Sequence, residues 1–136
     1  MAWRLFRPNI IKLQTHRNAD GLIAALRDRR ADVRQEAAAA LAWLKDARAV
    51  APLIAALDDR LPQVRECVAR SLGELADTRA VEPLLQTLGD HEPKVREAAA
   101  SALGELRDAR AVPSLLALLA DREWGVRERA VWALAD

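Results

Sequence analysis

Few residues in this chain have side chains suited to catalysis. Among its 136 residues, the sequence has two histidines (His16 and His91), one cysteine (Cys67) and three serines. Both histidines fall in predicted turns, far apart in the chain, and neither is near Cys67 in sequence. Nucleophilic catalysis needs a nucleophile and a base within hydrogen-bond reach. We therefore expect no catalytic residues and no enzymatic activity, with Cys67 as a packing or surface thiol.

Motifs for cofactors are also missing from the sequence. It contains neither a CxxC motif nor a glycine-rich phosphate loop, so we expect no cofactor and no structural metal. Carboxylates without histidine can still hold a hard cation, which the sequence disfavours but leaves open.

The composition indicates one compact helical domain. The chain is 51% hydrophobic and 30% charged, with a net charge of +1, which argues against a disordered chain and a membrane span. Alanine, the best helix former, is abundant, whereas five glycines and six prolines leave few turns for an all-β fold. One cysteine cannot form an internal disulfide, so we expect a cytoplasmic protein.

The elements that carry these residues repeat along the chain with a period of 31 residues. A Val-Arg dipeptide recurs at that period, beginning at Val33, Val64, Val95 and Val126. A second motif, Asp-x-Arg-Ala-Val, lies between these dipeptides and begins at Asp46, Asp77 and Asp108. The sequence therefore predicts four repeats, at about 15–45, 46–76, 77–107 and 108–136.

Each repeat predicts two helices, because apolar residues recur at three- and four-residue intervals in two segments. The predicted pairs span about 18–28 and 32–44, 49–58 and 63–75, 80–89 and 94–106, and 111–120 and 125–135. Asp46 is placed to cap the start of the first helix in its repeat. Pairs this short cannot bury their own apolar faces, so they must stack into one continuous core. We expect an all-α solenoid of about four antiparallel helix pairs.

The two ends of this stack are predicted to differ. Residues 1–14 do not fit the repeat, and Phe6, Ile10, Ile11 and Leu13 are expected to cover the first pair as a cap. No polar cap follows the fourth pair. Three explanations stay open: the sequence is cut from a longer chain, this end pairs with another molecule such as a second copy, or the exposed edge is tolerated.

The repeats resemble a known family. The pattern is Asp-x-Arg-Ala-Val-x-Pro-Leu-x-x-x-Leu, then Asp, then Val-Arg-x-x-Ala-x-x-x-Leu-Gly-x-Leu, and residues 95–106 match its second part closely. It resembles the short HEAT-like repeats of bilin lyase subunits and of many bacterial and archaeal scaffold proteins. The resemblance covers nearly the whole chain. It implies a right-handed superhelix, with the first helices on the convex side and the second helices on the concave side.

The resemblance also implies a structural role for the repeated aspartates and arginines. Asp59 would accept backbone N–H groups at the start of the following second helix. Arg65 and its equivalents would reach the aspartate of a neighbouring repeat, giving a ladder that fixes the stacking angle. The predicted ladder consists of Asp28, Arg34, Asp59, Arg65, Asp90, Arg96, Asp121 and Arg127.

One metalloenzyme, deoxyhypusine hydroxylase, is built of similar repeats and holds two irons with His-Glu pairs on its second helices. The matching positions here are Gln35-Glu36, Glu66-Cys67, Glu97-Ala98 and Glu128-Arg129. None of them contains histidine, and His91-Glu92 lies in a turn, out of register. The resemblance therefore does not extend to that activity.

Candidate binding residues occupy the positions of the second helices at which the repeats differ. Trp124, Glu128 and Trp132 are four residues apart and share one face of the last helix. Tryptophan and arginine are the residues most enriched at binding hot spots. The candidate set is Trp43, Glu66, Arg70, Glu97, Ser101, Trp124, Glu128, Arg129 and Trp132.

Structural alternatives exist for several of these residues. Trp132 could fold over the end of the stack as a makeshift cap, or pack on a further repeat. Trp43 is expected to lie partly exposed over its neighbours. Glu66 and Arg70 are four apart on one helix and can simply pair with each other.

The favoured hypothesis is a non-enzymatic scaffold or interaction module that binds a protein or peptide, with apolar and basic groups, on the concave face. An alternative is a non-catalytic subunit or domain of a modifying enzyme complex, such as a bilin lyase. Nucleic-acid binding through the basic N-terminal end is a less favoured alternative. Residues 1–31 carry a charge of +5, but residues 32–136 carry −4 and the groove positions are on balance acidic, which repels phosphate.

Overall fold

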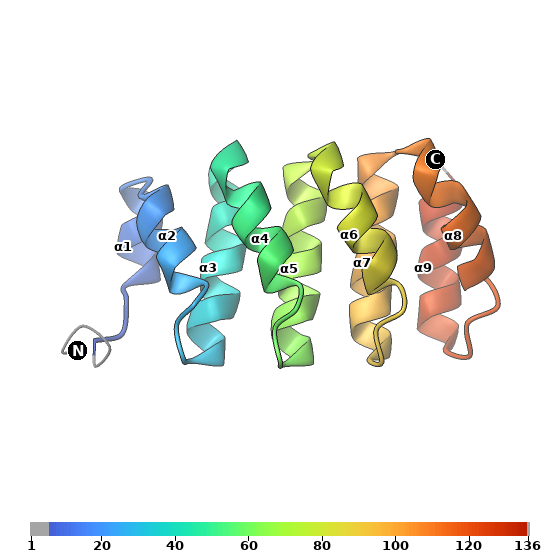
Figure 1. Ribbon diagram of the computed structural model, residues 1–136, viewed down its shortest axis with the longest axis horizontal. Helices are drawn as coiled ribbons and strands as arrows, with labels where there is room; N and C mark the ends of the chain where they lie inside the picture. Colours follow the sequence, from blue (N-terminus) through green and yellow to red (C-terminus); the bar gives the residue numbers. More distant parts are fainter. Residues whose placement is uncertain (1–5, 136) are drawn as a thin grey trace.

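The computed structural model describes residues 6–135, and within that range every regular element is a helix (Figure 1). A short N-terminal helix, α1 (Ile10–Thr15), is followed by four helix pairs. The first helices of the pairs are α2 (Ala19–Ala25), α4 (Val50–Ala56), α6 (Val81–Thr87) and α8 (Val112–Leu118). The second helices are α3 (Ala31–Leu44), α5 (Pro62–Leu75), α7 (Pro93–Leu106) and α9 (Trp124–Leu134). The predicted all-α solenoid is confirmed.

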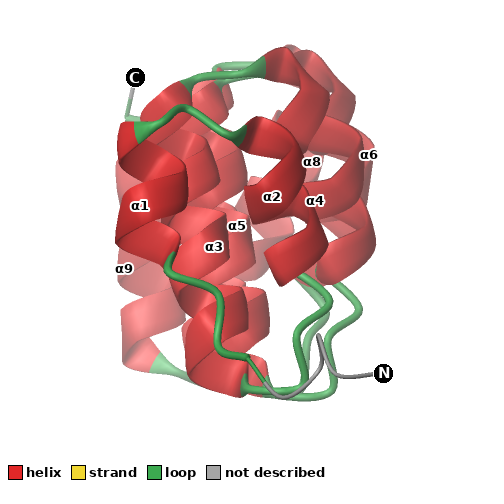
Figure 2. Ribbon diagram, turned by 90° about the vertical axis from the view of Figure 1, so that its left-hand side faces the viewer, coloured by secondary structure: helices red, strands yellow, loops and turns green. Residues whose placement is uncertain are grey.

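The helices form two rows, with α1 standing in the row of second helices (Figure 2). Neighbouring second helices pack directly on one another, and each first helix packs on the second helix of its own pair. The core between the rows is built from valine, leucine and alanine side chains that are almost completely buried. This arrangement leaves one side of α3, α5, α7 and α9 facing outward.

Small residues allow the second helices to approach closely. A Cβ atom added to Gly73 of α5 would lie 2.8 Å from the Cα atom of Ala102 in α7. One added to Gly104 of α7 would lie 3.0 Å from the Cα atom of Ala133 in α9. Any larger side chain at these positions would push neighbouring repeats apart.

The first helices are shorter than the spacing predicts. Asp46 does act as a cap, but its side chain accepts the N–H of Arg48 at 2.9 Å and closes a 3-10 turn, Ala47–Ala49, ahead of α4. Equivalent turns, Thr78–Ala80 and Ala109–Ala111, precede α6 and α8. At the other end of α4, the N–H groups of Leu57, Asp58 and Asp59 bond to carbonyls only three residues back. The α-helical geometry therefore ends about two residues early.

The N-terminal cap forms only in part. Ile10 is buried and Leu13 packs against the core, so α1 does cover part of the first pair. Phe6 and Ile11 are 75% and 76% exposed, and the expectation that they join the cap is wrong. Because α1 is short and amphipathic, it buries only one side, and Ile11 is rotated by about 100° from Ile10.

Arginine and aspartate side chains link consecutive pairs. The Nε atom of Arg34 donates to Asp59 at 2.7 Å, and its Nη2 atom donates to the second carboxylate oxygen at 3.1 Å. Arg65 and Asp90 repeat this geometry at 2.8 and 3.1 Å. Arg96 repeats it with Asp121, at 2.9 and 3.1 Å. Every side chain in these ion pairs is largely buried.

The same groups also order the turn inside each repeat. The Nη1 atom of Arg65 donates to the carbonyl of Asp59, which lies six residues earlier, at 2.8 Å. The carboxylate of Asp59 accepts the N–H of Leu61 at 3.0 Å. Leu61 immediately precedes α5. Asp59 therefore binds an N–H in the turn that leads into this helix, whereas the expected partners were N–H groups at the start of the helix itself. The first residue of α5 is Pro62, which has no N–H to donate.

The ladder ends differently at the two ends of the stack. Asp28, its first aspartate, accepts both the N–H and the Nη1 atom of Arg30, at 2.9 and 3.2 Å. Arg127, its last arginine, donates Nη1 to the carbonyl of Asp121 at 2.7 Å. Within residues 6–135, no carboxylate lies against its Nε and Nη2 atoms.

The ladder predicts a clear difference between two arginine substitutions. Arg96→Ala leaves the buried carboxylate of Asp121 without its partner and should cost about 3 kcal/mol of unfolding free energy. That corresponds to a drop in Tm of roughly 10 °C for a domain of this size. Arg127→Ala removes the equivalent side chain where no carboxylate is bound and should cost about 1 kcal/mol. Thermal melts followed by circular dichroism would compare the two, and an equal loss would contradict a structural role for the ladder.

The ladder aspartates also predict how stability depends on pH. Burial alone would raise the pKa of Asp90, but hydrogen bonds from Arg65 and from the N–H of Glu92 outweigh it, so the pKa lies below its ordinary value. The pKa values of Asp59 and Asp121 are lowered in the same way. Stability from a lowered carboxyl pKa is present at neutral pH and is lost as the pH falls below about 4. Urea unfolding between pH 7 and pH 2 should show this loss, and Asp90→Asn should reduce its slope.

Candidate functional site

The outward side of the second helices, here called the second-helix face, is rich in carboxylates. It consists of the side chains of α3, α5, α7 and α9 that point away from the first helices. Its acidic residues are Asp32, Glu36, Glu66, Glu74, Glu97, Glu105 and Glu128. Its basic residues on these helices are Arg70, Lys94 and Arg129. The face as a whole therefore favours cationic ligands.

A shallow hollow of about 210 Å³ lies across α5, α7 and α9. It brings together five of the predicted binding residues, which are Glu66, Arg70, Glu97, Ser101 and Arg129. Lys94, Glu105 and two alanines complete its lining. Glu128 is exposed on α9 but does not line this hollow.

Two of the carboxylates in this hollow already have cationic partners. Arg70 donates to Glu66 at 2.8 Å along α5, and Lys94 donates to Glu97 at 3.2 Å along α7. The first pair is the mutual pairing that the four-residue spacing allows. The basic side chains of both pairs are exposed, whereas the side chains of Glu66 and Glu97 are only 30% and 18% exposed, so a ligand would reach each carboxylate by displacing its basic partner.

Glu74 and Glu105 lie on adjacent helices, and their charges interact. Partial burial raises the pKa of Glu105, the negative charge of Glu74 raises it further, and only Lys45 opposes the shift. Lys45 donates its Nζ hydrogen to the backbone carbonyl of Glu74 at 2.6 Å. Both glutamates lie near the C-terminal ends of their helices, where the helix dipole also disfavours negative charge. Three unfavourable effects thus coincide at one place.

These two glutamates were not among the residues predicted to bind a partner. They are 31 residues apart and so occupy equivalent positions in successive repeats. The residue type at this position differs between repeats, which in the sequence marks it as a candidate binding position. The residue at that position in the first repeat is Trp43, which was predicted. The sequence could not show that the charges of Glu74 and Glu105 interact across two adjacent helices, because this depends on how the helices pack.

The three predicted tryptophans are separated by the acidic residues. Trp43 is 61% exposed and borders a larger hollow, of about 820 Å³, between α1 and α3. Trp124 and Trp132 are 68% and 65% exposed on α9. Trp132 therefore does not fold over the end of the stack, and the interpretation of this side chain as a makeshift cap is wrong. The structure places tryptophans at both ends of the second-helix face and carboxylates between them.

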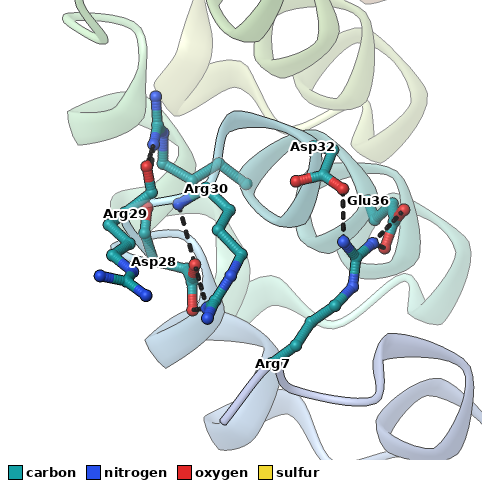
Figure 3. A network of polar contacts seen from close by, with 7 residues as sticks. Arg7, Asp28, Arg29, Arg30, Asp32 and Glu36 are labelled. Carbon is teal, nitrogen blue, oxygen red and sulfur yellow. Dashed lines mark hydrogen bonds and ion pairs between the residues drawn. The ribbon is translucent and has the colours of Figure 1, made fainter. Parts of the chain in front are cut away.

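At the N-terminal end, part of the basic charge is already neutralised (Figure 3). Arg7 donates Nη1 to Asp32 at 2.6 Å and Nη2 to Glu36 at 3.1 Å, bridging the two carboxylates on α3. The hydrogen bond from Arg7 also lowers the pKa of Asp32. Arg30 is paired with Asp28 in the same region. These pairs reduce the positive charge that a phosphate group would meet.

Other chemistry has little support in the described part of the chain. No cluster of three or more histidine, cysteine or acidic residues that could hold a metal ion occurs in residues 6–135. Burial raises the pKa of the Cys67 thiol, which donates to the carbonyl of Gln35 at 3.3 Å. None of the helices that the structure describes is long and apolar enough to cross a membrane.

Several solved structures are similar to this chain. The complex of CpcE and CpcF of phycocyanin lyase from Nostoc sp. PCC7120 contains a chain with 31% identity and a TM-score of 0.75, aligned over 85% of this chain. Human deoxyhypusine hydroxylase in complex with glycerol has 27% identity and a TM-score of 0.77 over 94% of this chain. A designed armadillo repeat protein in complex with the peptide (KR)4 has 26% identity and a TM-score of 0.68 over 93%.

The alignments cover only part of each similar protein. The chain spans 52% of the phycocyanin lyase chain, 46% of deoxyhypusine hydroxylase and 66% of the designed protein. No curated protein sequence matches the chain. A family model of HEAT repeats matches residues 19–91 and 52–135, which together include every helix pair. With this match and the stacked helix pairs, the chain belongs to the HEAT-repeat family.

Proposed function

We propose that this protein is a non-enzymatic interaction module that binds a basic segment of a partner protein on the second-helix face. The observation that carries the proposal is the placement of Glu74 and Glu105 on adjacent helices, with the Glu105 carboxyl beside Gly73, next to Glu74. Partial burial raises the pKa of Glu105, and the negative charge of Glu74 raises it further. A lysine or arginine side chain placed between them would relieve that repulsion. The designed armadillo repeat protein, a similar structure, was solved with the alternating basic peptide (KR)4, and this supports the choice of ligand.

The flanking residues suit a ligand of this kind. The exposed ring of Trp43 occupies the same position on α3 that Glu74 occupies on α5, and aromatic rings bind cations over their faces. Ser101 and Arg129 line the hollow beside the carboxylates and can bond to a peptide backbone or to an acidic side chain. Trp124 and Trp132 give an apolar end to the same face. We infer that a bound segment crosses from α3 towards α9, with basic residues at its centre.

A second candidate function is a non-catalytic subunit of a modifying complex. The similarity to a chain in the complex of CpcE and CpcF of phycocyanin lyase favours this candidate. The described residues offer no nucleophile paired with a base, so chemistry in such a complex would come from another component. Modifying activity that appears only after a partner subunit is added would support this function over a simple scaffold.

Glu105→Gln tests the basic-segment site. The substitution removes one of the two repelling charges, so affinity for the (KR)4 peptide should fall roughly twofold to fivefold, while thermal stability at pH 7 should rise slightly. Isothermal titration calorimetry and thermal melts would measure the two effects. Glu82→Gln, on the exposed side of α6, is the matched control and should leave peptide affinity unchanged. Equal effects of the two substitutions would show that only overall charge matters.

The pH dependence of binding offers a separate test. Because the pKa of Glu105 is raised, this carboxyl gains its proton at a higher pH than an ordinary glutamate. Peptide affinity should therefore weaken as the pH is lowered from 7 towards 4, and Glu105→Gln should reduce that dependence. Fluorescence anisotropy of a labelled (KR)4 peptide would record it, with a duplex oligonucleotide as comparison. Tighter binding to the oligonucleotide, with a steep loss on adding salt, would instead indicate nucleic-acid binding.

A further inference from the structure

Four helices of the row that forms the second-helix face are followed by a residue with positive φ. Within residues 6–135 these residues are Arg17 after α1, Lys45 after α3, Ala76 after α5 and Arg107 after α7, with φ angles of 51° to 56°. Three of them have basic side chains, and Ala76 is the exception. The junction between α5 and α7 therefore lacks a basic side chain at a position where the other repeats have one.

Two of these basic side chains reach the end of the next helix in the row. Arg17 donates Nη2 to the carbonyl of Leu44, the last residue of α3, at 3.1 Å. Lys45 donates Nζ to the carbonyl of Glu74, near the end of α5, at 2.6 Å. The last carbonyls of an α-helix have no partner within the helix and form the negative end of its dipole. Each cation thus stabilises the C-terminal end of the following helix.

Ala76 interrupts this series. It lies 31 residues after Lys45, and Glu105 lies 31 residues after Glu74, so the carbonyl of Glu105 is the equivalent acceptor near the end of α7. The methyl side chain of Ala76 has no hydrogen-bond donor to offer it. The Glu105 carboxyl lies beside Gly73 at the same junction, next to Glu74. Two carboxylates and a C-terminal carbonyl therefore meet where the chain itself supplies an alanine.

This junction is accessible and lies in the interior of the stack. Glu74, Ala76 and Glu105 are all exposed. Helix α3 packs on the other side of α5, and α9 packs on the other side of α7. A further repeat at either end of the chain would therefore not cover these residues.

We propose that Ala76 sets the anchor point of the bound segment, because it leaves room for a lysine of the partner that donates to the carbonyl of Glu105 and lies between the carboxylates of Glu74 and Glu105. This inference rests on the proposed function and names the side chain that is recognised. An ammonium group has three donors on a flexible stem, which suit three separate acceptors, whereas the planar fork of arginine matches one carboxylate. Lys45 shows that an ammonium group fits the equivalent carbonyl one repeat earlier.

Ala76→Lys tests the proposal, because the chain then supplies the missing cation itself. Lys45 adopts the same positive φ as Ala76, so the substitution adds no backbone strain beyond that already present. The new side chain should raise the Tm by roughly 2–4 °C. It should also compete with a bound lysine and reduce affinity for the peptide (KQ)4 by about tenfold. Thermal melts and isothermal titration calorimetry at physiological salt would measure the two effects.

Thr78→Lys is the matched control for the added charge. Thr78 is exposed and lies two residues further along, in the turn that leads to the first helix of the next pair. The same charge at this position should reduce affinity for (KQ)4 by less than about twofold. If both substitutions weaken binding equally, only the overall charge matters and Ala76 does not set an anchor point.

The peptide (QR)4 tests the preference for lysine, because it carries the same charge as (KQ)4. Ala76→Lys should weaken binding of (KQ)4 by a larger factor than binding of (QR)4. An equal loss for the two peptides would overturn the assignment of lysine to this junction.

A measurement on the unaltered chain separates this inference from the proposed function. Saturating (KQ)4 should lower the pKa of Glu105, followed by NMR of the side-chain carboxyl. Binding of (KQ)4 that leaves this pKa unchanged would place the peptide elsewhere on the second-helix face, so the anchor point would be wrong and the interaction module would stand. If the unaltered chain binds neither (KQ)4 nor (KR)4, the proposed function fails, and this inference fails with it.

Discussion

The buried ion pair between an arginine of one repeat and an aspartate of the next is the interaction on which the rest of the structure depends. Each arginine is anchored to a carbonyl in its own turn, and each aspartate orders the turn that leads into its own second helix. A buried ion pair adds little net stability compared with apolar packing, but leaving one half unpaired is costly. The ladder therefore acts chiefly on specificity, because any other stacking angle would separate a buried guanidinium from its carboxylate.

This fixed stacking determines what the protein presents to a partner. With glycine and alanine between the second helices, side chains at equivalent positions on adjacent helices come close together. The proximity of Glu74 and Glu105 is a direct consequence, although it is unfavourable for the folded protein. Unfavourable local electrostatics are tolerated where the rest of the fold is well determined, and they commonly coincide with binding sites. This acidic pair is the observation on which the proposed basic-segment site rests.

Periodicity explains both what could be predicted from the sequence and what could not. A residue that recurs every 31 positions has the same surroundings each time, so the helix pairs and the recurring aspartates and arginines followed from four aligned copies. The ladder that these residues form was implied by the resemblance to HEAT-like repeats. Phe6 and Ile11 have no equivalents in other repeats, and their exposure depends on the short length of α1. Glu74 and Glu105 occupy one variable position in successive repeats, where the first repeat has Trp43, so periodicity did not predict the interaction of their charges. Sequence reasoning was therefore strongest for the scaffold and weakest for the site.

The two ends of the ladder differ for a reason that follows from the same interaction. At the first repeat, Arg30 binds Asp28 in place of an arginine from a preceding repeat, and α1 covers part of the apolar surface. At the last repeat, Arg127 is positioned as in the interior, yet no described side chain performs the corresponding role. Among the described residues, an arginine closes the ladder only at the first repeat, and this closure uses the same carboxylate chemistry that joins the repeats inside the stack.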